Sequence, residues 1–151
     1  MKEKFNFRLE LFSTMWDKPP HAKINLNGVT FFDQDVNATQ DQPEVIKFQY
    51  TFNHGDHYDL CIEMSGKDNS QVVVDEQGNT IKDQLLHIKT IEIDDINIKD
   101  LLNEGVYTSK EHGSLTHVNS MGFNGKWVLS FKSPFYIWML DILHTKKYPC
   151  M

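Results

Sequence analysis

Alternation of apolar and polar residues, with a period of two, is the feature that most restricts how this chain can fold. Within residues 4–13, the apolar residues Phe5, Phe7 and Leu9 occupy every second position. Successive side chains of a β-strand point to opposite faces, so this pattern predicts a half-buried strand. The same alternation returns in four further segments, residues 24–31, 46–52, 58–64 and 127–131.

Turn-forming residues separate these segments. Asn27-Gly28 lies between two alternating runs and is a strong signal for a two-residue hairpin, and residues 53–56 predict the next turn. About eight short strands joined by such turns, with almost no long helical pattern, predict an all-β fold. We expect a single domain over residues 1–151, an antiparallel β-sandwich of the jelly-roll kind with room for one short helix.

The apolar positions change parity inside residues 85–93. Leu86 and Ile88 fall on one parity, whereas Ile91 falls on the other. A slip of this kind near Lys89 predicts either a β-bulge or a bend that carries the strand from one sheet to the next.

The C-terminal third of the chain has weaker patterns. Asp94-Asp95 predicts a tight turn with a short return strand, residues 99–103 a helical turn, and residues 107–119 a loop. Residues 135–143 form a short apolar run that periodicity alone cannot assign, so a last strand and a capping helix after Ser133-Pro134 both stay open. Aromatic residues and isoleucine dominate this run, which favours the strand.

Charge and hydropathy exclude several classes of partner. The chain carries 15 Lys and Arg against 21 Asp and Glu, a formal charge of −6. It has no basic run that could follow a phosphate backbone, so nucleic acid is not an expected partner. No window reaches the roughly 20 apolar residues that span a bilayer, so membrane insertion is not expected. The first residues lack the apolar block of a signal peptide, which predicts synthesis in the cytoplasm.

The sequence carries no motif typical of catalysis. It has no Gly-x-Ser-x-Gly elbow, no phosphate-binding glycine-rich loop and no His-Glu-x-x-His zinc motif. The carboxylates are spread over predicted strand edges and turns, and no spacing singles out an acid and base pair. We therefore expect a non-catalytic protein and no enzyme activity.

Two aromatic residues in predicted loops are candidates for stacking on a glycan. Trp16 lies near Pro19-Pro20, and Tyr107 opens the predicted loop at residues 107–119. A glycan-binding site needs an exposed ring that stacks on the apolar face of a sugar, with polar neighbours for the sugar hydroxyls. Either ring can instead pin its loop to the core, and both interpretations stay open.

Three motifs follow one another between residues 24 and 98. They are the Asn27-Gly28 hairpin, a strand at residues 57–62 that opens with histidine, and the segment Asp-Gln-Leu-Leu-His-Ile-Lys-Thr-Ile-Glu-Ile at residues 83–93. The order of these motifs resembles that in the small jelly-roll modules that bind xylan through calcium. Those modules have an early Asn-Gly hairpin and later a segment of the form Asp-Arg-Asn-Leu-Tyr-Val-Asp-x-Ile-x-Val. The resemblance covers about half of the chain and implies the fold of a carbohydrate-binding module.

This resemblance also implies a calcium site. In that family the aspartate that opens the segment helps to hold calcium, so the ligand implied here is Asp83. Calcium takes roughly six to eight oxygen ligands at about 2.3–2.6 Å, which irregular loops supply well. The loop that offers an Asn-Asp pair in the family reads Ser-Gly-Lys-Asp at residues 65–68, which places the cation of Lys67 near the implied ion. The candidate ligands that replace this pair are Asp68, Asp75 and Glu76.

A second resemblance concerns the overall layout. The acidic turn before this segment, and a tail of the form Trp-x-Leu-x-Phe followed by Pro-Phe-Tyr-Ile-Trp, resemble small uncharacterised proteins of tailed phages. This implies a virion component, in the capsid or the tail, that contacts other virion proteins, copies of itself or a glycan.

Our leading hypothesis is therefore a non-catalytic β-sandwich recognition or assembly module of a phage virion, with calcium-assisted glycan contact around Asp83. The alternative is a purely structural packing protein that adheres through residues 135–143. A free carbohydrate-binding protein is a further alternative.

Overall fold

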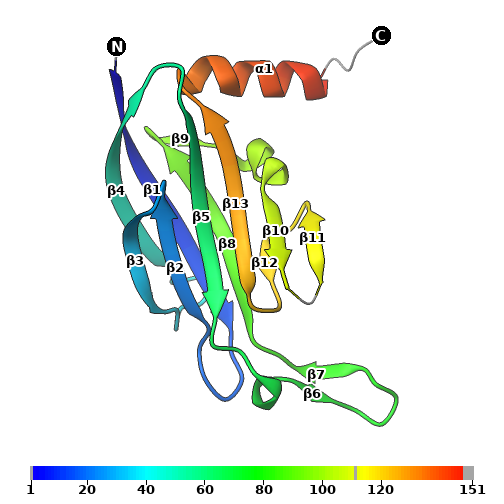
Figure 1. Ribbon diagram of the computed structural model, residues 1–151. Helices are drawn as coiled ribbons and strands as arrows, with labels where there is room; N and C mark the ends of the chain where they lie inside the picture. The colour runs from blue at the N-terminus through cyan, green and yellow to red at the C-terminus, as the bar shows by residue number, and fades with distance from the viewer. Residues whose placement is uncertain (1, 111, 148–151) are drawn as a thin grey trace.

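Two antiparallel sheets stacked face to face form the body of the protein in the computed structural model, which describes residues 2–110 and 112–147 (Figure 1). One helix, α1, lies across one end of this sandwich, and a two-stranded hairpin, β6 and β7, projects from the other end (Figure 1). The prediction of an antiparallel β-sandwich with one short helix is confirmed.

The first sheet is built around β1, which lies between β4 and β8. The expected strand at residues 4–13 is confirmed, because Phe5, Phe7 and Leu9 point into the core while the residues between them are more exposed. In this sheet the order is β12-β8-β1-β4, and β9 pairs with β8. Its strands are β1 (Lys2–Thr14), β4 (Glu44–Asn53), β8 (Leu85–Ile93), β9 (Ile96–Asn97) and β12 (Ser120–Met121).

The parity slip within β8 is a β-bulge. Glu10 of β1 pairs with Thr90, and the next residue, Leu11, pairs with Ile88, so Lys89 has no opposite partner. Lys89 is exposed, and the isoleucines on both sides of the bulge stay buried. The strand therefore remains in one sheet and does not bend into the other.

The tight turn predicted after β8 is also confirmed. Asp94 and Asp95 both have positive φ angles, of 49° and 66°, and β9 returns antiparallel to β8. Short acidic side chains tolerate this left-handed region better than most residues do.

The second sheet has the order β11-β10-β13-β5-β2-β3. The Asn27-Gly28 hairpin between β2 and β3 is confirmed, with φ angles of 49° and 83° that fit a turn with two left-handed residues. The strands of this sheet are β2 (His21–Leu26), β3 (Val29–Asp35), β5 (His57–Ser65), β10 (Val106–Ser109), β11 (Gly113–Thr116) and β13 (Gly125–Lys132).

The prediction of a loop at residues 107–119 is wrong over most of its length. Strands β10 and β11 form a hairpin there, and Tyr107 pairs with both Leu115 of β11 and Trp127 of β13. This segment is rich in Ser, Thr, Gly and His and shows little alternation, so its strand character comes from pairing with β13 and not from local preference.

Large side chains from both sheets fill the space between them. The faces predicted for the alternating segments are confirmed, because Phe52, Leu60 and Ile62 are fully buried, as are Trp127 and the other apolar residues of β13 that share its face. These residues belong to one continuous core cluster that includes members of both sheets.

Residues 135–143 are helical, so the interpretation that favoured a last strand is wrong. Helix α1 spans Phe135–Lys147. Phe135 is buried, and the residues that pack beside it on the core recur at helical spacing, Trp138, Met139, Ile142 and Leu143. Ile137 and Leu140 lie on the exposed side of α1, so apolar residues occur around most of the helix, and packing of one side on the core accompanies the helix despite the strand preference of the individual aromatic residues.

Short helical turns complete the fold. The turn expected at residues 99–103 is confirmed as η2 (Lys99–Glu104), and η1 (Asn69–Gln71) leads into the projecting hairpin of β6 (Val73–Val74) and β7 (Thr80–Lys82). Within residues 2–110 and 112–147, no helix has the length and apolar character needed to span a bilayer.

Candidate functional site

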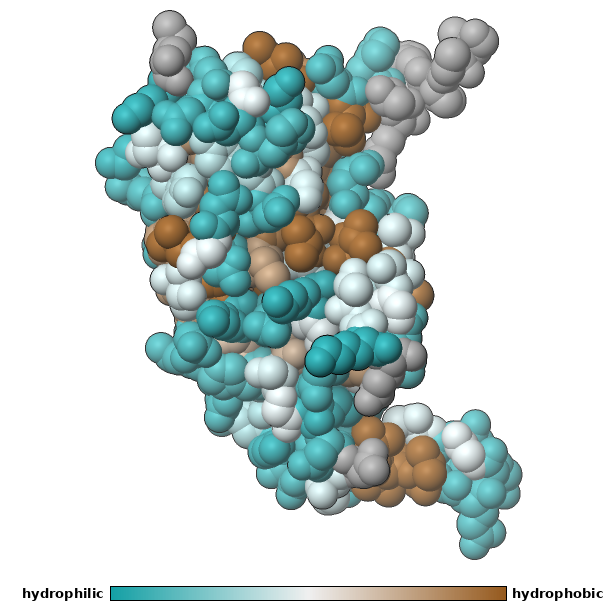
Figure 2. All heavy atoms as spheres, viewed as in Figure 1, coloured by the Kyte–Doolittle hydropathy of each residue, from teal (hydrophilic) through white to brown (hydrophobic). Residues whose placement is uncertain are grey.

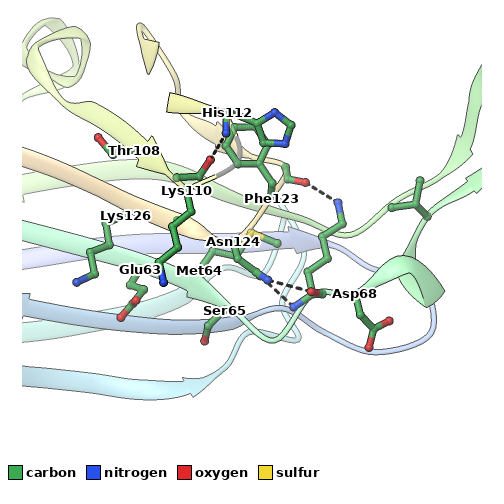
Figure 3. A pocket seen from close by; sticks show the side chains of 15 residues that line it. Glu63, Met64, Ser65, Asp68, Thr108, Lys110, His112, Phe123, Asn124 and Lys126 are labelled. Atoms are coloured by element: carbon green, nitrogen blue, oxygen red, sulfur yellow. Dashed lines mark hydrogen bonds between the residues drawn. The ribbon is translucent and has the colours of Figure 1, made fainter. Parts of the chain in front are cut away.

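An open hollow lies at one end of the second sheet (Figure 3). The β6–β7 hairpin projects from the same end of the sandwich (Figure 1). The hollow has a volume of about 1010 Å³ and is formed by the ends of β5, β10 and β13 and by the loops that follow β5 and precede β13. Its lining residues are Glu63, Met64, Ser65, Lys67, Asp68, Val72, Thr108, Ser109, Lys110, His112, Gly122, Phe123, Asn124, Gly125 and Lys126.

Aromatic rings form one wall of the hollow. The ring of Phe123 lies parallel to that of Tyr107, with centroids 4.8 Å apart. The ring of His112 is tilted by 39° against that of Phe123, with 4.1 Å between their centroids. Tyr107 is buried, Phe123 is half-buried and His112 is exposed, so the cluster runs from the core to the surface. Figure 3 shows His112 and Phe123 next to each other at the hollow. Such a wall offers an apolar surface to a ligand.

Gly125 allows the loop before β13 to come this close to β10. A Cβ atom at this position would lie 2.6 Å from the carbonyl oxygen of Thr108 and 2.7 Å from the ring of Tyr107. Both contacts are too short for any side chain, so the tight packing behind Phe123 requires glycine at this position.

Polar groups form the floor and the opposite side of the hollow. The side chain of Asn124 accepts a hydrogen bond from the backbone N–H of Lys67 (3.0 Å) and donates one to the carbonyl oxygen of Lys67 (2.9 Å). These two bonds fix the loop after β5 against the loop before β13 (Figure 3). Glu63 and Lys126 face each other in the register of β5 and β13, and both line the hollow.

The ammonium of Lys67 is bound to the aspartate that the sequence indicated as a metal ligand. Its Nζ donates to Oδ1 of Asp83 and to the carbonyl oxygen of Gly122, the latter at 2.5 Å. The side chain of Lys67 is 9% exposed and that of Asp83 is 27% exposed. Oδ1 of Asp83 also accepts the backbone N–H of Gln84 at 2.8 Å.

The second candidate ligand, Asp68, points elsewhere. Its Oδ1 accepts the backbone N–H of Ser70 at 2.8 Å, a hydrogen bond that lowers the pKa of Asp68. Its Oδ2 lies 3.9 Å from Nζ of Lys18, on an exposed surface. Asp68 therefore orders the start of η1, and it shares no hydrogen-bond partner with Asp83 in the part of the chain that the structure describes.

The third candidate, Asp75, belongs to the tip of the projecting hairpin. Its Oδ1 accepts the backbone N–H groups of Gln77 (2.9 Å) and Asn79 (2.8 Å). Hydrogen bonds of an aspartate to backbone groups two and four residues later stabilise a turn. The structure therefore gives Asp75 the role of organising the turn between β6 and β7.

These carboxylates do not fit a calcium ion. Calcium needs roughly six to eight oxygen ligands, usually with several carboxylates among them, and Asp83 has an ammonium as its partner. Within residues 2–110 and 112–147, no three His, Cys, Asp or Glu side chains come together in a way that could hold a metal ion.

Of the two aromatic candidates, Trp16 is exposed but lies outside the hollow. Its side chain is 38% exposed, and Nζ of Lys82 lies 3.5 Å from the centroid of its indole ring. This cation–π contact covers one face of the ring and joins the loop after β1 to the base of the β6–β7 hairpin. The same loop is held by the side chain of Gln84, which donates to the carbonyl oxygen of Lys18 at 2.9 Å.

The prediction that Tyr107 stacks on a sugar needs correction. Tyr107 lies in β10 and is 1% exposed, so its ring cannot reach a ligand in the hollow. Burial raises the pKa of Tyr107 to about 12. Its hydroxyl oxygen accepts the backbone N–H of Phe123 at 3.3 Å, so Tyr107 supports Phe123 from behind.

Phe123 and His112 were not among the residues predicted for a ligand site. A signal for Phe123 was present, because Gly-Phe-Asn-Gly at residues 122–125 places one aromatic ring inside a glycine-flanked turn. Glycines allow close backbone approach, and aromatic residues in loops often contact ligands. His112 had no comparable local signal.

Comparisons with known proteins support the fold. No family model matches the chain, and no curated protein matches it. A solved structure of vCBM60 in complex with galactobiose matches over 82% of this chain and 96% of its own, with a TM-score of 0.50 and 8% identity.

A second solved structure, the selenomethionine form of vCBM60, comes from work on two families of calcium-dependent carbohydrate binding modules linked by circular permutation. It matches over 83% of this chain and 89% of its own, with a TM-score of 0.51 and 9% identity. At such low identity the likeness establishes the fold alone. The expected resemblance to the fold of a calcium-dependent carbohydrate-binding module is confirmed.

Proposed function

We propose that this protein is a non-catalytic glycan-binding module and that the hollow beside Phe123 is its ligand site. The observation that carries the proposal is the aromatic cluster of Tyr107, Phe123 and His112, which ends at the surface of a hollow that also contains amide, hydroxyl and charged groups. The likeness to a module solved with galactobiose supports the same ligand class.

The chemistry of the hollow suits a polyhydroxylated ligand. The apolar face of a sugar ring packs on an aromatic side chain, and its hydroxyls both donate and accept hydrogen bonds. Glu63 supplies acceptors, Lys110 and Lys126 supply donors, and the Thr108 hydroxyl supplies both. The volume of about 1010 Å³ is slightly above the range of roughly 300–1,000 Å³ for ligand pockets, so the hollow has room for an oligosaccharide.

A glycan array followed by calorimetry tests this proposal, with galactobiose among the first ligands. We expect Phe123→Ala and His112→Ala to weaken binding at least about tenfold, a loss of about 1.4 kcal/mol. Trp16→Ala is the matched control, because it removes an exposed aromatic ring outside the hollow. Equal affinities of wild type and Phe123→Ala, or a loss confined to Trp16→Ala, would place the site elsewhere.

Calcium assistance at Asp83 is the finer version of this proposal. The likeness to calcium-dependent modules supports it, and the pairing of Asp83 with Lys67 opposes it. We therefore propose glycan binding that does not depend on calcium.

Assembly is a second candidate function, and the β6–β7 hairpin favours it. This hairpin projects from the body, and apolar side chains gather on it between its polar tip and the sandwich (Figure 2). Val74 is 55% exposed and Ile81 is 59% exposed. A two-stranded hairpin is only marginally stable alone, so packing against a neighbouring subunit would stabilise it. In this proposal the neighbours are copies of the same chain or other proteins of a phage virion.

The aromatic side chains of the tail are largely engaged by the core, whereas Ile137 and Leu140 of α1 are 60% and 61% exposed, as much as the apolar residues of the hairpin. The aromatic residues of α1 pack on the core of their own chain, and Phe135 is fully buried. Light scattering after size exclusion tests the hairpin: we expect Val74→Lys with Ile81→Lys to dissociate an oligomer of the wild type. A wild type that stays monomeric at high concentration, together with its absence from purified phage particles, would contradict the assembly proposal.

A further inference from the structure

One ammonium group joins three separate segments at the hollow. Lys67 lies in the loop after β5, Asp83 precedes β8 and Gly122 precedes β13, and the lysine is 16 and 55 positions away from these two partners. We infer that the ammonium of Lys67 is a built-in cation that holds this end of the sandwich together without a divalent metal ion. This inference concerns the cation and goes beyond the proposed glycan binding.

The ligands of the ammonium are those that a hard metal ion would need. It binds one carboxylate and one backbone carbonyl oxygen, which are the oxygen types that calcium prefers. Asp83 carries a single negative charge, and the charge of Lys67 neutralises it. A calcium ion at Asp83 would lie close to this ammonium, and like charges at that distance repel strongly in partly buried surroundings.

Lys67 is fixed both at its backbone and at its ammonium. Asn124 makes two hydrogen bonds to the backbone of Lys67, at 3.0 and 2.9 Å, and the side chain is 9% exposed. A swing of the lysine side chain into solvent, which would admit a metal ion, would break its hydrogen bonds to Asp83 and to the carbonyl oxygen of Gly122. The surroundings therefore retain the ammonium in the place beside Asp83.

The other acidic residues of this region do not compensate. Asp68 caps the backbone of η1 and lies near Lys18, while Glu63 lies on β5 opposite Lys126. In the described parts of the chain, 2–110 and 112–147, no set of three metal-ligating side chains includes Asp83. The charge that would offset a divalent ion is missing around the ammonium.

Thermal unfolding of the full chain, without any glycan, tests the inference. After dialysis against EDTA, addition of millimolar CaCl2 should change the melting temperature of the wild type by less than about 1 °C, because a ligand that does not bind the native state cannot stabilise it. A saturable rise in melting temperature with CaCl2 that is abolished in Asp83→Asn would overturn the inference.

Variants of the lysine provide the second arm. Lys67→Met keeps the length of the side chain and removes its charge, which leaves Asp83 partly buried without its partner. We expect a fall in melting temperature of about 5 °C or more. Lys110→Met is the matched control, because Lys110 is an exposed lysine of the same hollow, and should shift the melting temperature by less than about 1 °C.

Two further variants separate the ion pair from a simple loss of packing. Lys67→Arg retains the cation and should stay closer to the wild type than Lys67→Met does. The double variant Lys67→Met with Asp83→Asn should show a smaller fall in melting temperature than the sum of the falls in the two single variants. The inference would be overturned if the falls in melting temperature of the two single variants were additive in the double variant. It would also be overturned if Lys67→Met and Lys110→Met lowered the melting temperature equally. If Lys67→Met does not fold, the wild-type calcium titration and Lys67→Arg still decide it.

Discussion

The ring of Phe123 lies parallel to the ring of Tyr107, with 4.8 Å between their centroids and 7° between their planes. One ring belongs to a buried residue of β10 and the other to a loop at the hollow. The sheet therefore sets the orientation of the ring that we propose as part of the ligand site.

Removing the buried ring should destabilise the whole protein. Tyr107→Ala leaves a large cavity behind Phe123, and we expect it to lower the free energy of unfolding by about 3–5 kcal/mol. Tyr107→Phe keeps the stack and loses only the hydrogen bond to the backbone N–H of Phe123, at a cost of about 1 kcal/mol. Urea denaturation measures both values. Similar costs for the two substitutions would show that the ring stack contributes little.

A histidine between two aspartates should make stability depend on pH. Nε2 of His21 lies 2.6 Å from Oδ1 of Asp33, and Nδ1 lies 2.8 Å from Oδ1 of Asp35. The hydrogen bond to Asp33, followed by that to Asp35, raises the pKa of His21 above its ordinary value.

The pKa of His21 is higher in the folded than in the unfolded protein. The contribution of protonated His21 to the stability of the fold is therefore fully present below about pH 6.5 and is lost as the pH rises through the folded pKa. The stability difference between wild type and His21→Gln should therefore be larger at about pH 5.5 than at about pH 8.5, as urea denaturation at both pH values would measure. The effect should be modest because the site is partly exposed. A difference that is constant or grows with pH would contradict this account.

The bulge in β8 should be dispensable for the fold. Deleting Lys89 would leave Leu86, Ile88, Ile91 and Ile93 at every second position, all facing the core and in register with β1. We expect this deletion to fold with a melting temperature within about 5 °C of the wild type.

The matched control is deletion of Arg8 from the centre of β1, which has no bulge at that point. It would move Phe5 and Phe7 to the outer face relative to Leu9, and we expect it to abolish cooperative unfolding. A severe loss of stability on deletion of Lys89 would show that the extra residue is needed for the twist of the strand.

One carboxylate links the first strand to the last helix. Oε1 of Glu3 accepts the backbone N–H of Phe135 at 2.7 Å and the hydroxyl of Ser133 at 2.6 Å. A negative charge at a helix N-terminus satisfies free N–H groups and interacts favourably with the helix dipole. Glu3→Ala should lower the free energy of unfolding by about 1–2 kcal/mol in urea denaturation. Lys4→Ala, an exposed neighbour in β1, is the control and should cost less than about 0.5 kcal/mol.

Local sequence predicted those parts of the fold that local patterns determine. The alternation around Phe7 and the Asn27-Gly28 turn were sufficient for strands and a hairpin, and the parity change near Lys89 indicated the bulge. Strand β10 was missed because it depends on pairing with β13. For residues 135–143 a helix and a strand both stayed open, and the strand was favoured because the strand preference of the aromatic residues and isoleucine was given more weight.

The candidate site depends on tertiary contacts that no local pattern shows. The sequence placed Lys67 near an implied ion and named Asp83 as its ligand, but the bond between their side chains forms only when the ends of β5 and β8 meet. In the same way, Phe123 and His112 come from separate turns and meet in the folded protein.

An NMR titration of the isotope-labelled protein with the strongest glycan from the array locates the bound glycan on the protein. We expect the largest changes in amide chemical shift at residues 122–125 and at His112, and we expect these changes to persist in EDTA. Changes confined to the β6–β7 hairpin or to Trp16, or changes that require calcium, would contradict this expectation.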